Sequence, residues 1–223
     1  MTGPGPAAQV ATWIAVIPFK GAPAGKSRMS ASFDSKSRAE LANAFLLDTV
    51  AAVLAIPSIE QVLIVSDAPP PALPDRVRTI PDPGRGLNAA VAFGVDSARE
   101  LDAQCGVVVL TADLPLLTAA GLKDALGRAS AHSLAVVADK DGMGTTMLFA
   151  AAGVTLEPQF GVDSLAAHLA LGHQPLEVSA TLRFDVDTAA DLDRAVRSAE
   201  LGFATRQLLQ RIGRAPRVQL DAS

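Results

Sequence analysis

The sequence lacks features that several protein classes require. Cys105 is its one cysteine, so an internal disulfide is excluded. No apolar run reaches the ~18 residues of a membrane span. The net charge of −4 argues against broad nucleic-acid binding, which needs a basic surface. With no signal-peptide pattern either, we expect a cytoplasmic protein that binds neither membrane nor nucleic acid.

Several catalytic motifs are also missing. The three histidines, His132, His168 and His173, show no zinc-binding spacing, and the last two are expected to be exposed near helix ends. No serine stands in G-x-S-x-G, and Cys105 has no partner motif, so a buried structural thiol is expected. No G-x-G-x-x-G follows the first apolar run, as a Rossmann dehydrogenase would require.

What is present is an alternation of strand and helix patterns. Strand-like apolar runs cover residues 13–18, 61–66, 76–80, 107–110 and 134–138. Another strand is expected after a glycine-rich turn within 141–149. In residues 176–186 apolar and polar residues alternate, which also predicts a strand. Helical patterns cover residues 37–56, 89–101, 118–131, 162–171, 189–201 and 204–212. A capping box at 37–40 is expected to open the first of these helices. This order predicts an α/β fold of three layers, with helices on both faces of a mainly parallel sheet.

One domain is expected, because no repeat or linker interrupts the pattern. We predict a single domain over residues 13–214, with tails at 1–12 and 215–223. In parallel sheets, ligands bind at the carboxyl ends of the strands. Three segments with charged residues are expected at these strand ends: the loop after Pro18, residues 111–115 and residues 185–188.

The loop after the first strand carries Lys20, Lys26 and Arg28 among glycine, proline and alanine. Such a loop lets backbone N–H groups approach phosphate oxygens, and the cations offset their charge. Its glycine spacing is one residue too short for a P-loop. Phosphate binding and a solvated basic loop both remain open from these residues.

Acidic residues follow two of the apolar runs. Asp113 lies just past the strand at 107–110, and Asp185 and Asp187 alternate on an expected strand. Mg²⁺ takes one or two carboxylates together with substrate phosphates, so Asp113 and Asp185 could share a metal. The alternative is that Asp113 caps a turn, and that Asp187 or Thr188 caps the helix that follows.

Two glycine-containing segments could bind an anion. Gly144 and Thr145 offer N–H and hydroxyl donors, and Gly161 and Ser164 lie at an expected helix start, where free N–H groups favour negative charge. The alternative is an ordinary turn and a helix cap at Ser164.

The ordered set of motifs resembles the phospholactate/phosphoenolpyruvate guanylyltransferase family. The matching segments are AVIPFKGAPAGKSRMS (15–30), GLNAAV (86–91), VVLTADLPLL (108–117), DGMGTT (141–146), FGVDS (160–164) and DVDTAADL (185–192). The resemblance implies a Rossmann-like, GT-A-like nucleotidyltransferase fold. It also implies transfer of a guanylyl group from GTP to phosphoenolpyruvate or 2-phospho-L-lactate, with release of pyrophosphate, in coenzyme F-420 biosynthesis. The next enzyme of that pathway is then an expected partner.

The resemblance also assigns roles to residues. Thr145, Gly161 and Ser164 match the acceptor contacts, and Asp113 and Asp185 match the ligands of Mg²⁺ and are expected to be catalytic. The loop residues Lys20, Lys26 and Arg28 would hold the GTP phosphates, Lys26 with a catalytic role, and Asn88 would lie near the base. No role is assigned to Met143.

Two rival functions stay open. One is another nucleotidyltransferase, of the molybdopterin or sugar-phosphate type, although those begin with a longer glycine-rich loop. The other is a non-catalytic nucleotide-binding module, which a large separation of Asp113 and Asp185 would favour. The residues alone leave the choice of three-carbon acid undecided.

Overall fold

A seven-stranded sheet forms the centre of the molecule, in the order β3-β2-β1-β4-β6-β5-β7. The structure is a computed structural model that describes residues 12–21, 29, 32–67 and 73–214. The strands are β1 (Trp13–Pro18), β2 (Ile59–Val65), β3 (Val77–Ile80), β4 (Gly106–Leu110), β5 (Leu134–Ala138), β6 (Thr145–Ala150) and β7 (Gln174–Pro175). All pair in parallel except β6, which runs antiparallel to both β4 and β5. The mainly parallel sheet is therefore confirmed.

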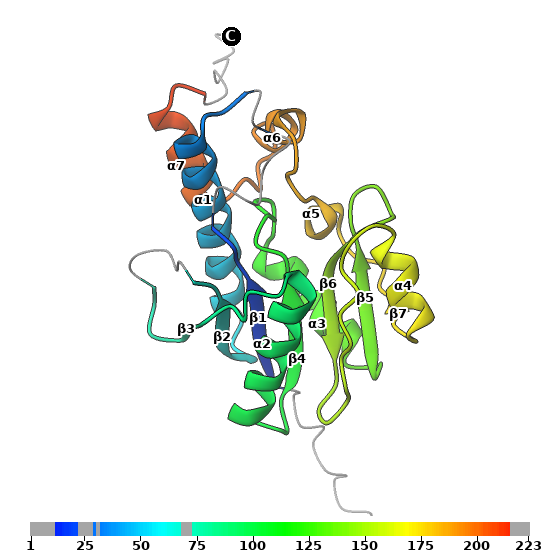
Figure 1. Cartoon of the computed structure of the whole chain (residues 1–223). Helices are drawn as coiled ribbons and strands as arrows, with labels where there is room; N and C mark the ends of the chain where they lie inside the picture. The colour runs from blue at the N-terminus through cyan, green and yellow to red at the C-terminus, as the bar shows by residue number, and fades with distance from the viewer. Residues whose placement is uncertain (1–11, 22–28, 30–31, 68–72, 215–223) are drawn as a thin grey trace, which may run out of the picture.

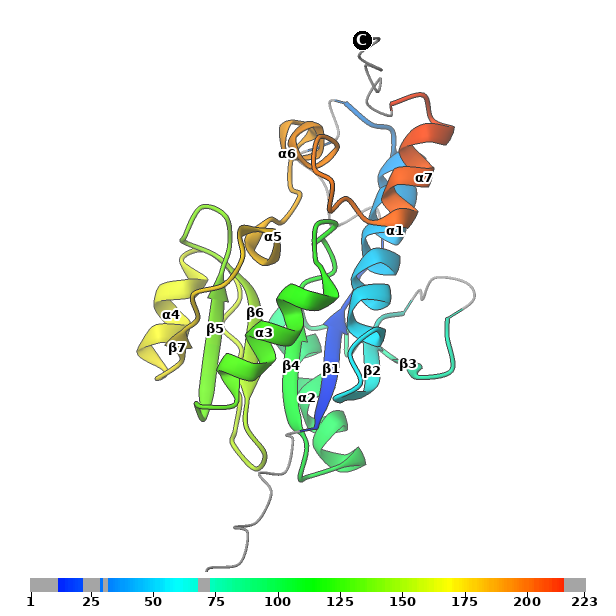
Figure 2. The same ribbon diagram turned by 180° about the vertical axis from the view of Figure 1, so that it is seen from behind.

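Helices cover both faces of this sheet, as Figures 1 and 2 show. They are α1 (Ser35–Leu54), α2 (Leu87–Leu101), α3 (Ala119–Ala129), α4 (Ser164–Ala170), α5 (Ala180–Arg183), α6 (Ala189–Ala195) and α7 (Phe203–Arg211). Alternate residues of β1 separate the two cores: Ala15 and Ile17 pack with α1 and α3, whereas Ile14 and Val16 pack with α2. The three-layer α/β arrangement is confirmed.

A third apolar cluster extends the molecule beyond the carboxyl ends of the parallel strands. It joins the first half of α1 to α6 and α7, which are labelled in Figure 2. Phe45 and Leu209 of this cluster are buried. The buried carboxylate of Asp48 on α1 accepts hydrogen bonds from the backbone of Ala204 and Thr205 at the start of α7. This cluster includes Val186, so it holds the 185–188 segment over the same edge of the sheet.

Three of the expected elements were wrong in detail. Residues 176–186 do not form a strand, because Ser179 caps the short helix α5 and the Thr146 hydroxyl donates to the Leu182 carbonyl. Helix α1 begins at Ser35 and is capped by Asp34, whose side chain accepts from the Ser37 amide, so the capping box expected at 37–40 is not its start. The helix expected to reach residue 201 ends at Ala195.

Thr118 caps α3, whose helical pattern was expected to begin at residue 118, and Thr188 caps α6, where the sequence offered Asp187 or Thr188. Among the described helices, none combines the length and apolar character needed to cross a membrane.

Candidate active site

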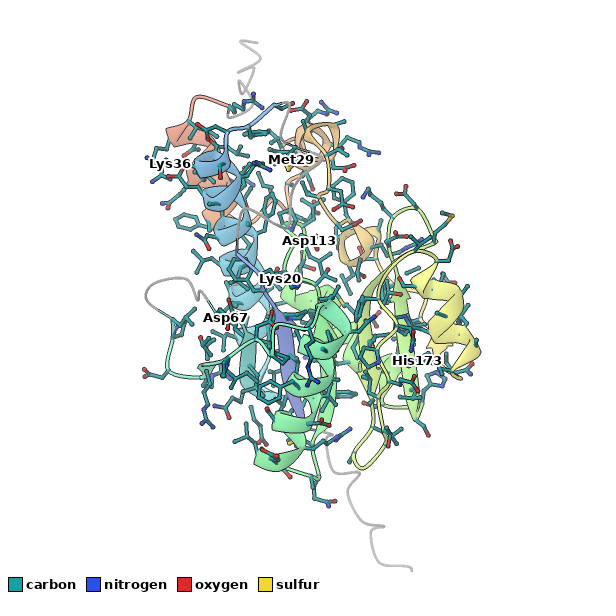
Figure 3. All side chains as sticks on the ribbon, in the orientation of Figure 1. Lys20, Met29, Lys36, Asp67, Asp113 and His173 are labelled. Carbon is teal, nitrogen blue, oxygen red and sulfur yellow. The ribbon has the colours of Figure 1, made fainter. Side chains whose placement is uncertain are left out.

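A pocket of about 270 Å³ opens at the carboxyl ends of β1 and β4. Its polar lining includes Lys20 after β1 and Thr111 and Asp113 after β4. Leu87, the first residue of α2, closes one side, and Phe45 of α1 is part of the apolar wall. Figure 3 shows Lys20 and Asp113 near one another at this end of the sheet. This is the edge at which ligands bind to parallel α/β sheets.

Asp113 and Asp185 are brought together at this edge. The Val186 amide donates to the Asp113 carbonyl at 3.1 Å, which joins the segment after β4 to the segment after α5. Burial raises the pKa of Asp185, and the negative charge of Asp113 raises it further. The hydrogen bond from Lys140 opposes these two effects, but the pKa of Asp185 still rises to about 6. A buried carboxylate beside another negative charge forms a site that a cation would stabilise. The large separation expected of a simple binding module is absent.

The sequence did not indicate Lys140, whose ammonium lies beside the Asp185 and Asp191 carboxylates. These two carboxylates and Asp113 form the acidic cluster of the site. The Lys140 ammonium donates to the Asp185 carboxylate at 2.8 Å and to the Asp185 carbonyl at 2.9 Å, and it lies 3.8 Å from Asp191. Burial lowers the pKa of Lys140, but the bond and charge of Asp185 outweigh it, so the net shift is upward. A protonated lysine therefore stands beside the carboxylate. Its position just after β5, at the carboxyl end of a strand, is the signal that could have identified it.

Asp187 and Thr188 belong to the start of α6. The Thr188 side chain and Asp191 form a capping box, and the Asp191 carboxylate also accepts from the Asp187 amide at 3.2 Å. The capping role expected of Thr188 is confirmed. The cap fixes the chain just after Asp185 and so contributes to the position of that carboxylate.

Thr145 and Ser164 meet beneath the same edge. Because β6 is antiparallel, its first residue, Thr145, lies near the carboxyl end of β4. The Ser164 hydroxyl donates to the Thr145 hydroxyl at 3.2 Å, and both side chains are buried. The alternative role of Ser164 as a helix cap is wrong: Asp163 is the N-cap of α4, and the Ser164 hydroxyl is bonded to Thr145.

Gly161 presents an open position close to this pair. Its φ of 146° lies in the region that favours glycine, and a Cβ built there would meet no protein atom within 4 Å. The neighbouring backbone is fixed by Asn88 of α2, whose amide donates to and accepts from Phe160 at 3.0 and 2.7 Å. Asn88 therefore holds the 160–164 segment, and its expected place near a base stays a prediction.

The two histidines that follow were wrongly expected to be exposed. His168 and His173 have 0% and 1% of their surface exposed, with ring centroids 5.3 Å apart. His168 bonds to Thr145 and Gln159, and His173 Nδ1 lies 3.1 Å from the Ala135 carbonyl. These partners satisfy both ring nitrogens of His168 and Nδ1 of His173, whereas His173 Nε2 is buried with no hydrogen-bond partner among the described residues. A helix-end pattern in the sequence cannot reveal such contacts.

Lys26 and Arg28 lie outside the described residues, so the predicted phosphate loop is represented by Lys20 and Gly21 at its start.

A second cluster of potential metal ligands lies at the opposite edge of the sheet. Glu60, Asp102 and Cys105 precede or open strands β2 and β4 and place their ligand atoms within 4.8 Å of one another. Burial and the hydrogen bond to Asp102 raise the pKa of the Cys105 thiol to about 11. The thiol is therefore protonated at neutral pH, and a metal ion bound there would have to displace its proton. The buried structural thiol expected at Cys105 is confirmed.

The comparisons with solved structures concern the fold. A putative nucleotide-diphospho-sugar transferase from Desulfovibrio desulfuricans G20 has a TM-score of 0.69 at 15% identity, covering 92% of this chain and 96% of that one. The 2-C-methyl-D-erythritol 4-phosphate cytidylyltransferase of Francisella tularensis has a TM-score of 0.57 at 13% identity, covering 83% of this chain and 98% of its own. The Rossmann-like nucleotidyltransferase fold is confirmed.

Other proteins have a higher sequence identity to this chain than these solved structures have. A protein of Sanguibacter keddieii named phosphoenolpyruvate guanylyltransferase is 38% identical over 91% of this chain and 86% of its own length. A protein of the same name from Streptomyces coelicolor is 41% identical over 82% of this chain and 90% of its own. The family model described as "Guanylyl transferase CofC like" matches residues 13–216. The chain is therefore an enzyme of the CofC-like guanylyl transferase family.

Proposed function

We propose that this enzyme transfers a guanylyl group from GTP to phosphoenolpyruvate and releases pyrophosphate, as a step of coenzyme F-420 biosynthesis. The relatives named above support phosphoenolpyruvate as the acceptor, with 2-phospho-L-lactate as the alternative. The observation that carries the proposal is the pairing of Asp113 with Asp185 beside the pocket that Lys20 lines.

Asp113 and Asp185 are proposed to hold Mg²⁺. The donors fit this ion, because Mg²⁺ prefers carboxylate and phosphate oxygens. The burial of Asp185 and the negative charge of Asp113 raise the pKa of Asp185, which favours positive charge at this site. When bound, Mg²⁺ would neutralise charge on the phosphates. Lys140 then acts on the site from one side by fixing the orientation of Asp185 through two hydrogen bonds.

The remaining residues divide between the two substrates. Lys20, Lys26 and Arg28 are proposed to bind the GTP phosphates, Lys26 as a catalytic cation, with Asn88 close to the nucleotide. Thr145, Gly161 and Ser164 are proposed to bind the acceptor. Support comes from the pocket at Lys20, the open space at Gly161 and the contact of the two hydroxyls.

The chemistry requires alignment more than proton transfer. An oxygen of the acceptor phosphate attacks the α-phosphorus of GTP, a new P–O bond forms, and the bond to the β-phosphate oxygen breaks as pyrophosphate leaves. The acceptor oxygen is already an anion, so no general base is needed. Lysine side chains, and a cation held by the two carboxylates, can offset the negative charge that accumulates on the phosphates during the reaction. Such a reaction explains a site without a histidine or cysteine nucleophile.

We propose that residues 13–214 act as one nucleotidyltransferase domain in the cytoplasm. The product passes to the next enzyme of the pathway.

A product assay tests this function. The enzyme is incubated with Mg²⁺ and GTP together with phosphoenolpyruvate, 2-phospho-L-lactate or 3-phosphoglycerate, in the presence of the next enzyme of the pathway. Pyrophosphate is measured and the products are identified by mass spectrometry. We expect pyrophosphate to depend on GTP and to be largest with phosphoenolpyruvate. Equal release with CTP or ATP, or none with any of these acids, would contradict the proposal.

Removing the charge of Lys20 should weaken the use of GTP selectively. For Lys20→Ala we expect the KM for GTP to rise about tenfold, because one charge-assisted phosphate contact is lost, while the KM for the acid changes little. Steady-state kinetics with each substrate varied in turn measures both. The exposed Lys36 on α1 offers a control, Lys36→Ala. An equal rise in both KM values would indicate a structural role for Lys20.

Removing Lys140 should make the folded protein depend more on divalent metal. In Lys140→Met, the Asp185 and Asp191 carboxylates lose a nearby cation, and we expect the Tm in EDTA to fall by roughly 3–10 °C. Mg²⁺ should then raise the Tm of the variant more than that of the parent enzyme, since it replaces the lost charge. Lys123→Met, at an exposed lysine of α3, is the control. The same response to Mg²⁺ in parent and variant would separate Lys140 from the metal site.

A further inference from the structure

The hydrogen bonds of His168 determine which of its ring nitrogens carries a proton. Nε2 lies 2.9 Å from the Gln159 backbone nitrogen, which can only donate. Nε2 must therefore be the acceptor, and a neutral imidazole then carries its hydrogen on Nδ1. Burial lowers the pKa of His168 to about 4, with a smaller contribution from His173, so the ring is neutral at physiological pH.

This tautomer orients the Thr145 hydroxyl. His168 Nδ1 lies 3.0 Å from Thr145 Oγ1, so it donates to that oxygen, and the Ser164 hydroxyl donates to the same oxygen at 3.2 Å. A hydroxyl oxygen accepts two hydrogen bonds and donates one. With both acceptor positions engaged, Thr145 can take part in a further bond only as a donor.

We propose that His168 is a positioning residue that fixes the Thr145 hydroxyl as a hydrogen-bond donor to the anionic acceptor substrate. This inference rests on the proposed function, in which Thr145 binds the acceptor. An unconstrained hydroxyl could turn a lone pair toward a carboxylate or phosphate, whereas this one is held in the donating state. His168 acts from beneath, since its ring is fully buried and bonded on both sides.

The spectroscopic test is independent of activity. In ¹⁵N-labelled enzyme, the long-range ¹H–¹⁵N couplings of the histidine rings distinguish Nδ1–H from Nε2–H, and a His168→Asn sample assigns the signals. We expect His168 to be neutral with its hydrogen on Nδ1. The Nε2–H tautomer, or a charged ring at pH 7, would overturn the inference.

The kinetic test asks whether His168 acts through Thr145. We expect His168→Leu to raise the KM for phosphoenolpyruvate about tenfold or more, with the KM for GTP changed less than about twofold. His168→Asn keeps an amide donor near Nδ1 and should recover part of the loss. In a Thr145→Val background, where the hydroxyl is gone, His168→Leu should add less than about twofold.

His173→Leu is the matched control, because this histidine is equally buried and touches the His168 ring but has no bond to Thr145. Equal kinetic effects of His168→Leu and His173→Leu, or fully additive effects with Thr145→Val, would overturn the positioning role. If the parent enzyme is active and either of these results is found, only the role of His168 is refuted. A parent enzyme that transfers no guanylyl group to any acid refutes the proposed function as well.

Discussion

Asp185→Asn is expected to abolish guanylyl transfer while the enzyme stays folded. Asparagine keeps the size of the side chain and an oxygen that can accept from Lys140, but it removes the negative charge proposed to bind Mg²⁺. Loss of one element of transition-state charge stabilisation typically lowers kcat by about 10²–10³-fold, and loss of the metal should lower it at least as much. Asp113→Asn should behave alike. Pyrophosphate release and the Tm are the two measurements.

Asp193→Asn provides the control for Asp185→Asn. Asp193 is an exposed carboxylate on α6, in the same part of the chain but outside the acidic cluster. Its activity and Tm should match those of the parent enzyme. Near-normal turnover in Asp185→Asn or Asp113→Asn would remove these carboxylates from the metal site, whatever the control shows.

Gly161→Val is expected to exclude the acceptor acid while GTP still binds. The backbone φ of 146° is strained for any residue with a Cβ, and the branched side chain would occupy the open space in which we place the acceptor. We expect the KM for phosphoenolpyruvate to rise by about 10²-fold or beyond saturation, whereas GTP affinity measured by calorimetry should change less than about threefold.

Gly153→Val separates backbone strain from occupation of the site. Gly153 also has a positive φ, of 70°, and open space around its Cβ position, but it lies in the turn after β6, away from Thr145. Both variants should therefore lose stability, and only Gly161→Val should lose acceptor binding. Comparable losses of acceptor binding in both, or an unchanged KM in Gly161→Val, would contradict the acceptor site.

The parts of the fold that the sequence predicted depend on local signals. The apolar run of β1 and the runs of β4 and β5 are buried on both faces, which uninterrupted valine and isoleucine indicate directly. Thr118 and Thr188 cap helices because their hydroxyls reach amides three residues away. Such features need no knowledge of distant contacts.

Features that depend on distant partners were missed. The alternation of residues 176–186 is that of a strand, but the Leu182 carbonyl is bonded by Thr146, 36 residues earlier, and the segment folds as α5 and an irregular stretch. The antiparallel direction of β6 is likewise set by its neighbours β4 and β5 and not by its own residues.

The residues of the candidate site also divide into those marked by local sequence signals and those defined by distant contacts. Asp113 was predictable because it lies just past a buried strand. Its approach to Asp185 was predicted from a strand at 176–186 that does not form, and the Val186 amide joins the two segments instead by donating to the Asp113 carbonyl. Lys140 and His168 were not predictable, since each is defined by a partner more than 20 residues away, Asp185 for one and Thr145 for the other. A lone lysine or histidine carries no sequence signal for such a pairing.

Isotope transfer tests the central claim most directly. The enzyme is given phosphoenolpyruvate, Mg²⁺ and GTP labelled with ³²P at either the α or the γ position, and the acid product and pyrophosphate are separated. Guanylyl transfer predicts that the α label enters the acid product and that the γ label leaves entirely as pyrophosphate. The γ label in the acid product would indicate phosphoryl transfer, and the absence of label from the acid in both reactions would indicate that no group transfer occurs.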